Sequence, residues 1–167
     1  MASYPCSTGS LNYIDTAYSQ GRVFRAFYGF DGDTVIKVQS LENIDLTSAR
    51  QDVNDGDMRY RVFLGGSDAT AFTVDIPTLR LNLKEGVPVL NSQVIAKTGG
   101  TVDLTGATQI AESRIKASNA SGQRESIVNS QLSVRGFPPG VFYIVIDTIP
   151  GDIGSPEGLL EFEWIIK

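Results

Sequence analysis

Histidine is absent from this sequence of 167 residues, and cysteine occurs once, at Cys6. Histidine is the usual acid or base near neutral pH, the partner of catalytic serine and cysteine nucleophiles, and a frequent zinc ligand. A single cysteine permits no disulfide within the chain. The sequence therefore predicts that the protein is not an enzyme and has no catalytic residues, no cofactor and no metal site.

Clustered basic residues and long apolar segments are also missing. The 14 lysine and arginine residues are scattered among 19 aspartate and glutamate residues, and the net charge is −5. Nucleic-acid binding needs a basic patch, and crossing a bilayer needs about 20 consecutive apolar residues. We therefore expect no nucleic-acid partner and no membrane partner. Residues 1–5 lack the basic and apolar segments of a secretory signal, which predicts a chain made in the cytoplasm.

Two acidic patterns match functional sites only in part. Glu161 and Glu163 would face the same side of a strand, as the carboxylate pair of a sugar-cleaving enzyme could. The favoured interpretation is an edge strand protected from aggregation by its charges. Residues 52–57 alternate oxygen-bearing side chains as a calcium loop does, but Gly56 and Phe63 stand where ligands belong. We expect a flexible acidic turn there.

Short apolar runs separated by glycine, proline, asparagine and aspartate fill the sequence, with almost no helical period. This pattern predicts an all-β chain, folded as an antiparallel β-sandwich of the Ig-like or jelly-roll-like kind. Strands are expected at residues 22–30, 34–41, 58–64, 71–76, 79–83, 89–96, 108–117, 125–134, 141–147 and 159–166.

Several local features can be predicted within this pattern. Asp31-Gly32-Asp33 is typical of a tight hairpin between its flanking strands. Residues 50–57 are expected to form a solvent-exposed loop. Pro77 requires a strand edge or a strand break, and the edge near residues 78–83 is expected to be open to a neighbour's sheet.

Two strands near the end of the sequence carry different burial patterns. Residues 141–146 are apolar on both sides of the pleat, which predicts a central strand covered on both faces. The final strand alternates, with acidic residues on one face. Its apolar face consists of Leu160, Phe162, Trp164 and Ile166.

The chain is expected to have three parts. Residues 1–20 are small and polar apart from a few anchors, and form an extended N-terminal arm that orders against another protein. Residues 21–86 form an N-terminal β region and residues 87–167 a second one, with the boundary near residues 84–86. The alternative is one continuous domain over residues 21–167.

A faint internal repeat links residues 44–49 with residues 102–107, since both contain Asp-Leu-Thr and end in alanine. Each segment precedes a strand with basic residues, at residues 59–62 and 114–117. Duplication of half a domain and chance similarity between short β segments are both open explanations.

Aromatic and apolar side chains near the start of the sequence are candidates for an assembly interface, because the arm has few other anchors and the first strand holds more aromatic area than a small core hides. Packing within the core and a hairpin is the alternative. The candidates are Tyr4, Leu11, Tyr13, Ile14 and Tyr18 in the arm, and Phe24, Phe27 and Tyr28 in the first strand.

A run of motifs in the second half resembles a known family. Val-Asp-Leu-Thr-Gly-Ala-Thr at residues 102–108 leads into an alternating strand that ends with Arg-Ile-Lys-Ala at residues 114–117. A polar segment at residues 118–123 and Pro-Pro-Gly-Val-Phe-Tyr at residues 138–143 follow. A variable acidic loop and the closing strand complete the order of elements.

In this order, residues 87–167 resemble the β-sandwich domain near the start of phage baseplate upper proteins and related tail proteins. The match departs from the family's pattern at residues 109–113, where clean apolar alternation is missing, and residues 1–86 have no counterpart. The resemblance implies a β-sandwich without catalytic residues.

The resemblance further implies a non-enzymatic structural protein of a bacteriophage virion, in the tail or baseplate region and made in the host cytoplasm. Its partners would be other phage virion proteins. A homo-oligomer, either a trimer or a ring, is expected because symmetry multiplies weak contacts. Two alternatives remain open: a capsid decoration or cement protein, and a carbohydrate- or surface-binding module whose exposed aromatic rings stack on sugars.

Overall fold

The protein consists of antiparallel β-strands over the residues that the structure describes. The computed structural model describes residues 22–53, 57–81, 89–90, 94–116, 125–129, 134–148 and 157–167. In this part of the chain, no helical segment has the length and apolarity to span a bilayer. The predicted all-β sandwich is confirmed, and the predicted arm at residues 1–20 lies outside the described residues.

The first layer is a seven-stranded sheet. Its members are β1 (Val23–Asp31), β3 (Ile44–Val53), β7 (Thr78–Leu81), β8 (Val89–Leu90), β12 (Glu125–Asn129), β13 (Val134–Phe137) and β15 (Glu157–Ile166). They are ordered β12-β3-β15-β1-β7-β8, and β13 also pairs with β3.

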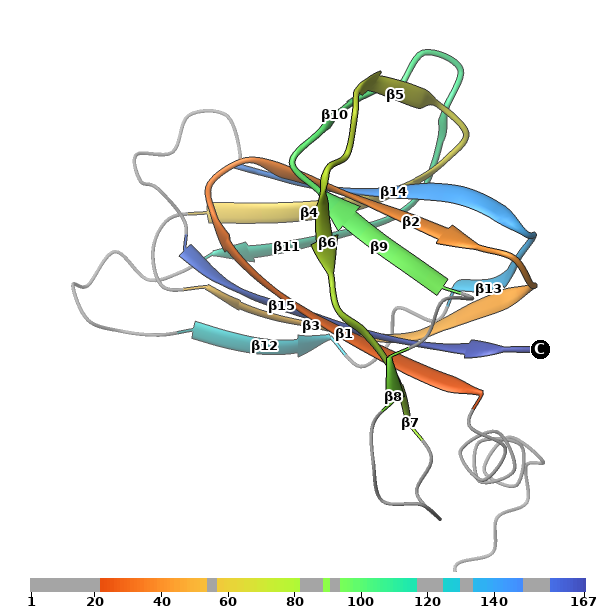
Figure 1. Ribbon diagram of the computed structural model, residues 1–167. Coiled ribbons are helices and arrows are strands. Elements are labelled where there is room, and N and C mark those ends of the chain that lie inside the picture. Colours follow the sequence, from red (N-terminus) through yellow and green to blue (C-terminus); the bar gives the residue numbers. More distant parts are fainter. Residues whose placement is uncertain are drawn as a thin grey trace, which may run out of the picture.

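The second layer is a six-stranded sheet. Its members are β2 (Thr34–Ser40), β4 (Asp57–Leu64), β6 (Val74–Ile76), β9 (Val94–Thr98), β11 (Thr108–Lys116) and β14 (Gly140–Thr148). Their order is β11-β4-β14-β2-β9-β6, and the two sheets lie face to face (Figure 1).

Eight of these strands have the connectivity of a jelly roll. In chain order they are β1, β2, β3, β4, β11, β12, β14 and β15. The first of the eight pairs with the last and the third with the sixth in one sheet, while the second pairs with the seventh and the fourth with the fifth in the other. This is the arrangement of a strand hairpin rolled up into two facing sheets, which defines the jelly roll.

The connection between β4 and β11 is long and has strands of its own. It widens the six-stranded sheet through β9 and β6, and the seven-stranded sheet through β7 and β8. Pro77 falls between β6 and β7, which belong to different sheets, so the predicted strand break is confirmed. The connection also contains β5 (Ser67–Thr70) and β10 (Thr101–Asp103), which pair only with each other among the described strands.

The core lies between the two sheets. Its side chains come from alternate residues of the strands, and each large one contributes about 1.5–3 kcal/mol through burial. The largest fully buried side chains are Trp164, Tyr60, Phe24, Phe137, Phe162, Ile36, Ile44, Leu46, Met58, Ile144 and Ile146.

The burial of the two late strands is as predicted. β14 lies between β4 and β2, and its Phe142, Tyr143, Ile144 and Ile146 are buried on both faces. β15 buries its apolar row against the core, whereas Glu161 and Glu163 lie on the opposite face. β15 is not an edge strand, however, because β3 and β1 flank it.

The hairpin predicted at Asp31-Gly32-Asp33 is wrong. The strands on either side form as expected, and Gly32 has a φ of 116°. They belong to different sheets, so the turn carries the chain across the sandwich. A local turn pattern reports a reversal of direction, but not which strand becomes the neighbour.

Three other local predictions also need correction. The expected loop at residues 50–57 is largely strand, since β3 runs to Val53 and buries it together with Gln51, while residues 54–56 lie outside the described part. The expected single strand at residues 89–96 is divided between β8 and β9, which belong to different sheets. The edge expected to be open near residues 78–83 is not open over the described residues 78–81, because β7 lies between β1 and β8.

The internal repeat has no structural counterpart. Residues 44–49 lie inside β3, whereas residues 102–107 end β10 and form a turn. The two halves of the sequence are interleaved, since β14 and β15, from residues 87–167, lie between strands from residues 21–86. Both halves therefore share one core; the expected boundary at residues 84–86 lies outside the described residues.

Candidate interaction surfaces

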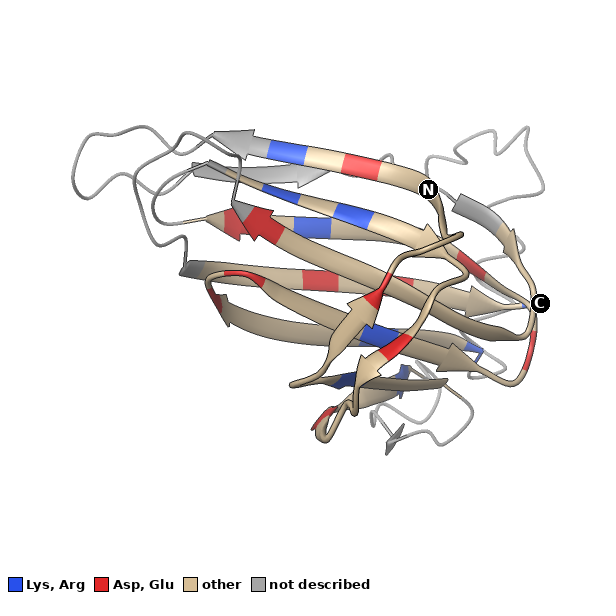
Figure 2. Ribbon diagram, turned by 90° about the horizontal axis from the view of Figure 1, so that it is seen from above, with Lys and Arg blue, Asp and Glu red and all other residues tan. Residues whose placement is uncertain are grey.

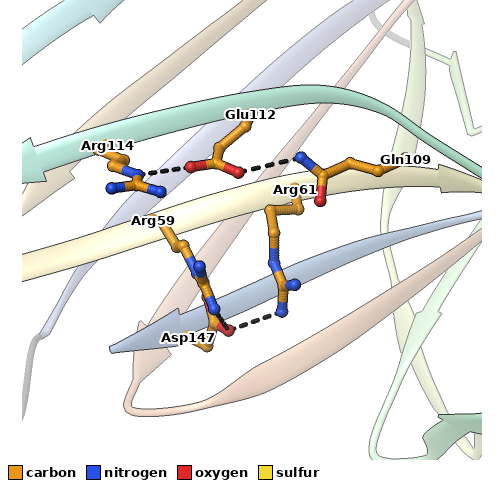
Figure 3. A network of polar contacts seen from close by, with 6 residues as sticks. All are labelled: Arg59, Arg61, Gln109, Glu112, Arg114 and Asp147. Atoms are coloured by element: carbon orange, nitrogen blue, oxygen red, sulfur yellow. Dashed lines mark hydrogen bonds and ion pairs between the residues drawn. The ribbon is translucent and has the colours of Figure 1, made fainter. Parts of the chain in front are cut away.

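A polar network covers part of the outer face of the six-stranded sheet (Figure 3). On β4, Arg59 and Arg61 alternate with the buried Tyr60 and Val62, so the period of the strand places both guanidinium groups on the outer face. The register sets Asp147 of β14 directly opposite Arg59.

Asp147 accepts three hydrogen bonds from these two arginines. Nε and Nη2 of Arg59 donate to its two oxygens at 2.7 and 2.9 Å, and Nη2 of Arg61 donates to Oδ2 at 2.7 Å. The hydrogen bond to Asp147 raises the pKa of the Arg59 guanidinium. The carboxylate thus holds two like charges side by side on one strand.

β11 adds a second set of charges to the same face. Arg114 and Gln109 both donate to the carboxylate of Glu112, and these hydrogen bonds lower the pKa of Glu112. Across the strand pair, Glu112 lies opposite Arg61, and Arg114 lies opposite Arg59. Figure 2 shows the acidic and basic segments interspersed along the strands.

The chemistry of this network is that of fixed charges. Each of its two carboxylates accepts hydrogen bonds from at least one guanidinium group, which occupies the oxygen lone pairs. The network therefore supports the sheet and gives its outer face a defined charge pattern.

Replacing Asp147 with alanine is expected to lower the free energy of unfolding by about 1–2 kcal/mol, since it leaves two partly buried arginines without their shared partner. The side chains of Arg59, Arg61 and Asp147 are only 18–21% exposed. Arg50→Ala is the matched control, because its ion pair with Asp52 is more exposed and the expected loss is below about 0.5 kcal/mol. Urea unfolding of both variants measures the difference, and equal losses would contradict this account.

A two-stranded flap, defined as residues 65–73 and 99–107, lies against the same sheet. Its Phe72 ring contacts Tyr143 of β14, with centroids 6.0 Å apart. Asp68 accepts a hydrogen bond from the Tyr143 hydroxyl at 2.8 Å. It also forms an ion pair with Lys37 of β2 at 2.6 Å. The flap thereby covers Tyr143, which is 3% exposed although it points away from the core.

The motif at residues 102–108 covers the end of β10, the last turn of the flap and the first residue of β11. The Asp103 side chain accepts a hydrogen bond from the Thr105 N–H at 2.9 Å, and the Ala107 N–H donates to the Leu104 carbonyl at 2.9 Å. Gly106 has a φ of 76°, a conformation that glycine adopts without strain. The sequence motif is therefore a turn motif with a clear conformational reason.

The flap contact predicts a loss of stability at high pH. Burial, reinforced by the hydrogen bond to Asp68, raises the pKa of Tyr143 to about 12. An unfolded tyrosine has a pKa of about 10. Between pH about 10 and pH about 12, the unfolded chain therefore releases a proton that the folded chain keeps. The contribution of Tyr143 to the free energy of unfolding is fully present below pH about 10 and is lost as the pH rises through this window.

Tyr143→Phe isolates this contribution, because burial also raises the pKa of Tyr60 to about 12 and that residue titrates in both proteins. We expect the variant to lose up to about 2 kcal/mol less than the unaltered protein across the window. Urea unfolding as a function of pH measures the two slopes. Parallel slopes would show that Tyr143 does not contribute.

The outer face of the seven-stranded sheet holds the two glutamates singled out by the sequence. Arg25 of β1 bridges them, with Nε 3.3 Å from Glu161 and Nη2 2.5 Å from Glu163. Thr47 also donates to Glu163. The shared guanidinium accounts for two carboxylates lying side by side, and both belong to a central strand rather than to a protected edge.

The predicted interface residues fall into three groups. The five in the arm lie outside the described residues. Phe24 is a core residue, 1% exposed, and Tyr28 is half-buried, with its hydroxyl 3.1 Å from Thr34 Oγ1. Phe27 is 45% exposed and lies on the outer face with the exposed Leu159 near it, so this is the one member of β1 that presents an aromatic ring to solvent.

The polar network and the Asp68 contacts were not predicted from the sequence. Arg59 and Arg61 could have been placed outward from their spacing, but their partner Asp147 is 88 residues away from Arg59 along the chain. The acidic turn at residues 52–57 lies partly outside the described residues, and over the part that is described no group of three or more potential metal-binding side chains occurs.

Comparisons with protein-family models, with curated proteins and with solved structures find no match for this chain. The jelly-roll connectivity and the surfaces described above are therefore the observations from which a function can be inferred.

Proposed function

We propose that the protein is a non-enzymatic structural protein of a bacteriophage particle, in the tail or baseplate region, that works by symmetric assembly with other virion proteins. The observation that carries the proposal is the jelly-roll connectivity of the two sheets. This architecture recurs in viral capsid and lectin domains, which is support by analogy of fold. The proposed location in the tail or baseplate is taken from the order of sequence motifs within residues 87–167, which resembles that of phage baseplate proteins.

The use of charged side chains also supports a structural role. Asp147, Glu112, Glu161 and Glu163 are all held in ion pairs on the outer faces of the two sheets. Such pairs fix the shape and the charge pattern of a surface, and complementary charge patterns select partners in assembly. The ion pairs of these carboxylates thus stabilise the outer faces of the sandwich.

Among the described residues, the surfaces favour protein contacts over sugar stacking. The single tryptophan, Trp164, is 1% exposed, so it offers no platform for a sugar ring. Phe27 and Leu159 instead present apolar side chains beside the Arg25 ion pairs. An apolar centre with a charged border is typical of a contact between proteins.

Quantitative mass spectrometry of purified phage particles, from a host that carries the gene, tests the proposal. We expect the chain at a fixed number of copies per particle, and labelling by a specific antibody at the tail in electron micrographs. Labelling of the capsid shell would favour a decoration protein instead. A chain that is expressed but absent from purified particles would overturn the structural role.

A further inference from the structure

The nine-residue strand β11 forms one edge of the six-stranded sheet. Among the described residues it is paired with β4 alone. An unpaired strand edge carries a row of backbone donors and acceptors, to which another strand can be added. The pairing with β4 is irregular between Gln109 and Ala111, and regular from Ala111 to Lys116.

The regular part of β11 has two rows of side chains. Ala111 and Ser113 lie opposite buried residues of β4, so this row faces the core. Glu112 and Arg114 lie opposite arginines of β4, on the outer face. They form an ion pair with each other, and the Arg114 side chain is still 59% exposed.

We propose that β11 pairs with β11 of a second copy of the chain, antiparallel, about a two-fold axis that passes through Ser113. This register sets Glu112 of each copy opposite Arg114 of the other, because both residues lie one position from the axis. Two ion pairs then form across the new strand pair on the outer face. The six-stranded sheets of the two copies become one continuous sheet.

The charges of β11 select this register over its neighbours. Residues directly opposite each other in an antiparallel pair share a face, so the axis must pass through a residue. An axis at Glu112 would set that carboxylate against its own copy, and an axis at Arg114 would do the same for the guanidinium. Like charges directly opposite each other destabilise a strand pair, whereas opposite charges stabilise it.

The existing sheet adds a second argument. Arg114 lies directly opposite Arg59, a like-charge pair within one copy. Pairing about Ser113 adds Glu112 of the second copy on the other side of Arg114. The row across the joined sheets then runs Asp147, Arg59, Arg114 and the second copy's Glu112, so each arginine has an acidic residue directly opposite it on a neighbouring strand.

The competing interpretation is that Glu112 and Arg114 keep the edge unpaired, as charges on edge strands often do. Charges that only protect an edge need not be self-complementary. Glu112 and Arg114 lie opposite each other in a symmetric strand pair when the axis passes through Ser113, and at no other position of the axis. The inference rests on the proposed function, because it identifies the partner in one assembly contact as a second copy of the chain.

Charge reversal in the full-length chain tests the pairing. In sedimentation velocity at increasing concentration, the unaltered protein is expected to form a dimer. Glu112→Arg alone or Arg114→Glu alone sets like charges opposite each other and should raise the dimer dissociation constant by about tenfold or more. The double variant restores the opposite charges and should restore the dimer. A chain that stays monomeric, or single variants that dimerise as well as the unaltered protein, would overturn the proposal.

Cysteine crosslinking tests the register independently. In a Cys6→Ser background, Glu112→Cys and Arg114→Cys place thiols at positions that are directly opposite only between two different variants. Directly opposite residues have Cα atoms about 4.5–5.5 Å apart, within the range of a disulfide, whereas diagonal positions are farther apart. We expect disulfide-linked dimers in the mixture and few in either variant alone. Equal crosslinking in all three samples would contradict an axis at Ser113.

These results are separable from the proposed function. A chain that is monomeric in solution and present in purified particles would overturn the β11 pairing and leave the structural role standing. A chain that dimerises through β11 and is absent from particles would overturn the structural role and leave the pairing standing. Circular dichroism of each variant verifies that the fold is retained.

Discussion

Trp164→Ala is expected to lower the free energy of unfolding by about 3–5 kcal/mol, the usual range for removing a large aromatic side chain from a core. Trp164 is 1% exposed and lies on β15, the central strand between β3 and β1. Its ring stacks against Phe162, with centroids 6.0 Å apart. Truncation therefore opens a cavity where the two halves of the sequence meet.

Two further variants give this prediction its controls. Phe27→Ala removes an aromatic ring from the neighbouring β1, but the ring is 45% exposed, so we expect a loss within about 0.5 kcal/mol. Trp164→Phe keeps most of the volume and removes an indole N–H that has no hydrogen-bond partner within the described structure, so the loss should be about 1–2 kcal/mol.

Urea unfolding followed by far-UV circular dichroism is the appropriate measurement, since Trp164 is the only tryptophan and its fluorescence disappears with it. Similar losses for Trp164→Ala and Phe27→Ala would contradict the placement of β15 at the centre of the sheet.

Gly158→Ala is expected to cost at least about 3 kcal/mol, because a methyl group has no room at this position. Gly158 lies between Phe30 of β1 and Val53 of β3 in the seven-stranded sheet. A Cβ atom there would overlap the Asp52 carbonyl oxygen and come within 2.6 Å of the Phe30 ring. The clash is with backbone and a buried ring, so the strands themselves would have to separate.

Gly29→Ala is the matched control, one strand away in the same sheet. A Cβ atom at Gly29 would have the Gly158 carbonyl oxygen as its nearest neighbour, at an ordinary 3.9 Å. We expect a change within about 1 kcal/mol and in the stabilising direction, since alanine restricts the unfolded chain more than glycine does. Thermal and urea unfolding compare the two variants. A tolerated Gly158→Ala would mean that β15 does not pack against β3 in this register.

The distribution of apolar and polar residues over the two faces of each strand is enough to predict most strands of this fold. It identifies β14 as a central strand and the inward row of β15, because these depend only on the two faces of a single strand. Pro77 is likewise read correctly as a break, since the missing N–H acts locally.

Pairing partners could not be predicted in the same way. Asp31-Gly32-Asp33 has the composition of a hairpin turn, yet its strands pair with segments more than a hundred residues away as well as with nearer ones. Arg25 and Glu163 are 138 residues apart in the chain and in contact in the structure. A sequence pattern reports the period of a strand, while the choice of neighbour depends on how all the strands fill the two sheets.

The interleaving of β14 and β15 has a consequence for how the protein is made. The ribosome produces these strands after the other described strands, and each belongs at the centre of a sheet. Until residues 140–166 have emerged, β1 and β3 have no strand between them, and neither do β2 and β4. Long-range strand pairing of this kind is slow. A nascent chain halted before Gly140 thus exposes four bare strand edges rather than a smaller folded unit, so folding waits until residues 140–166 have emerged.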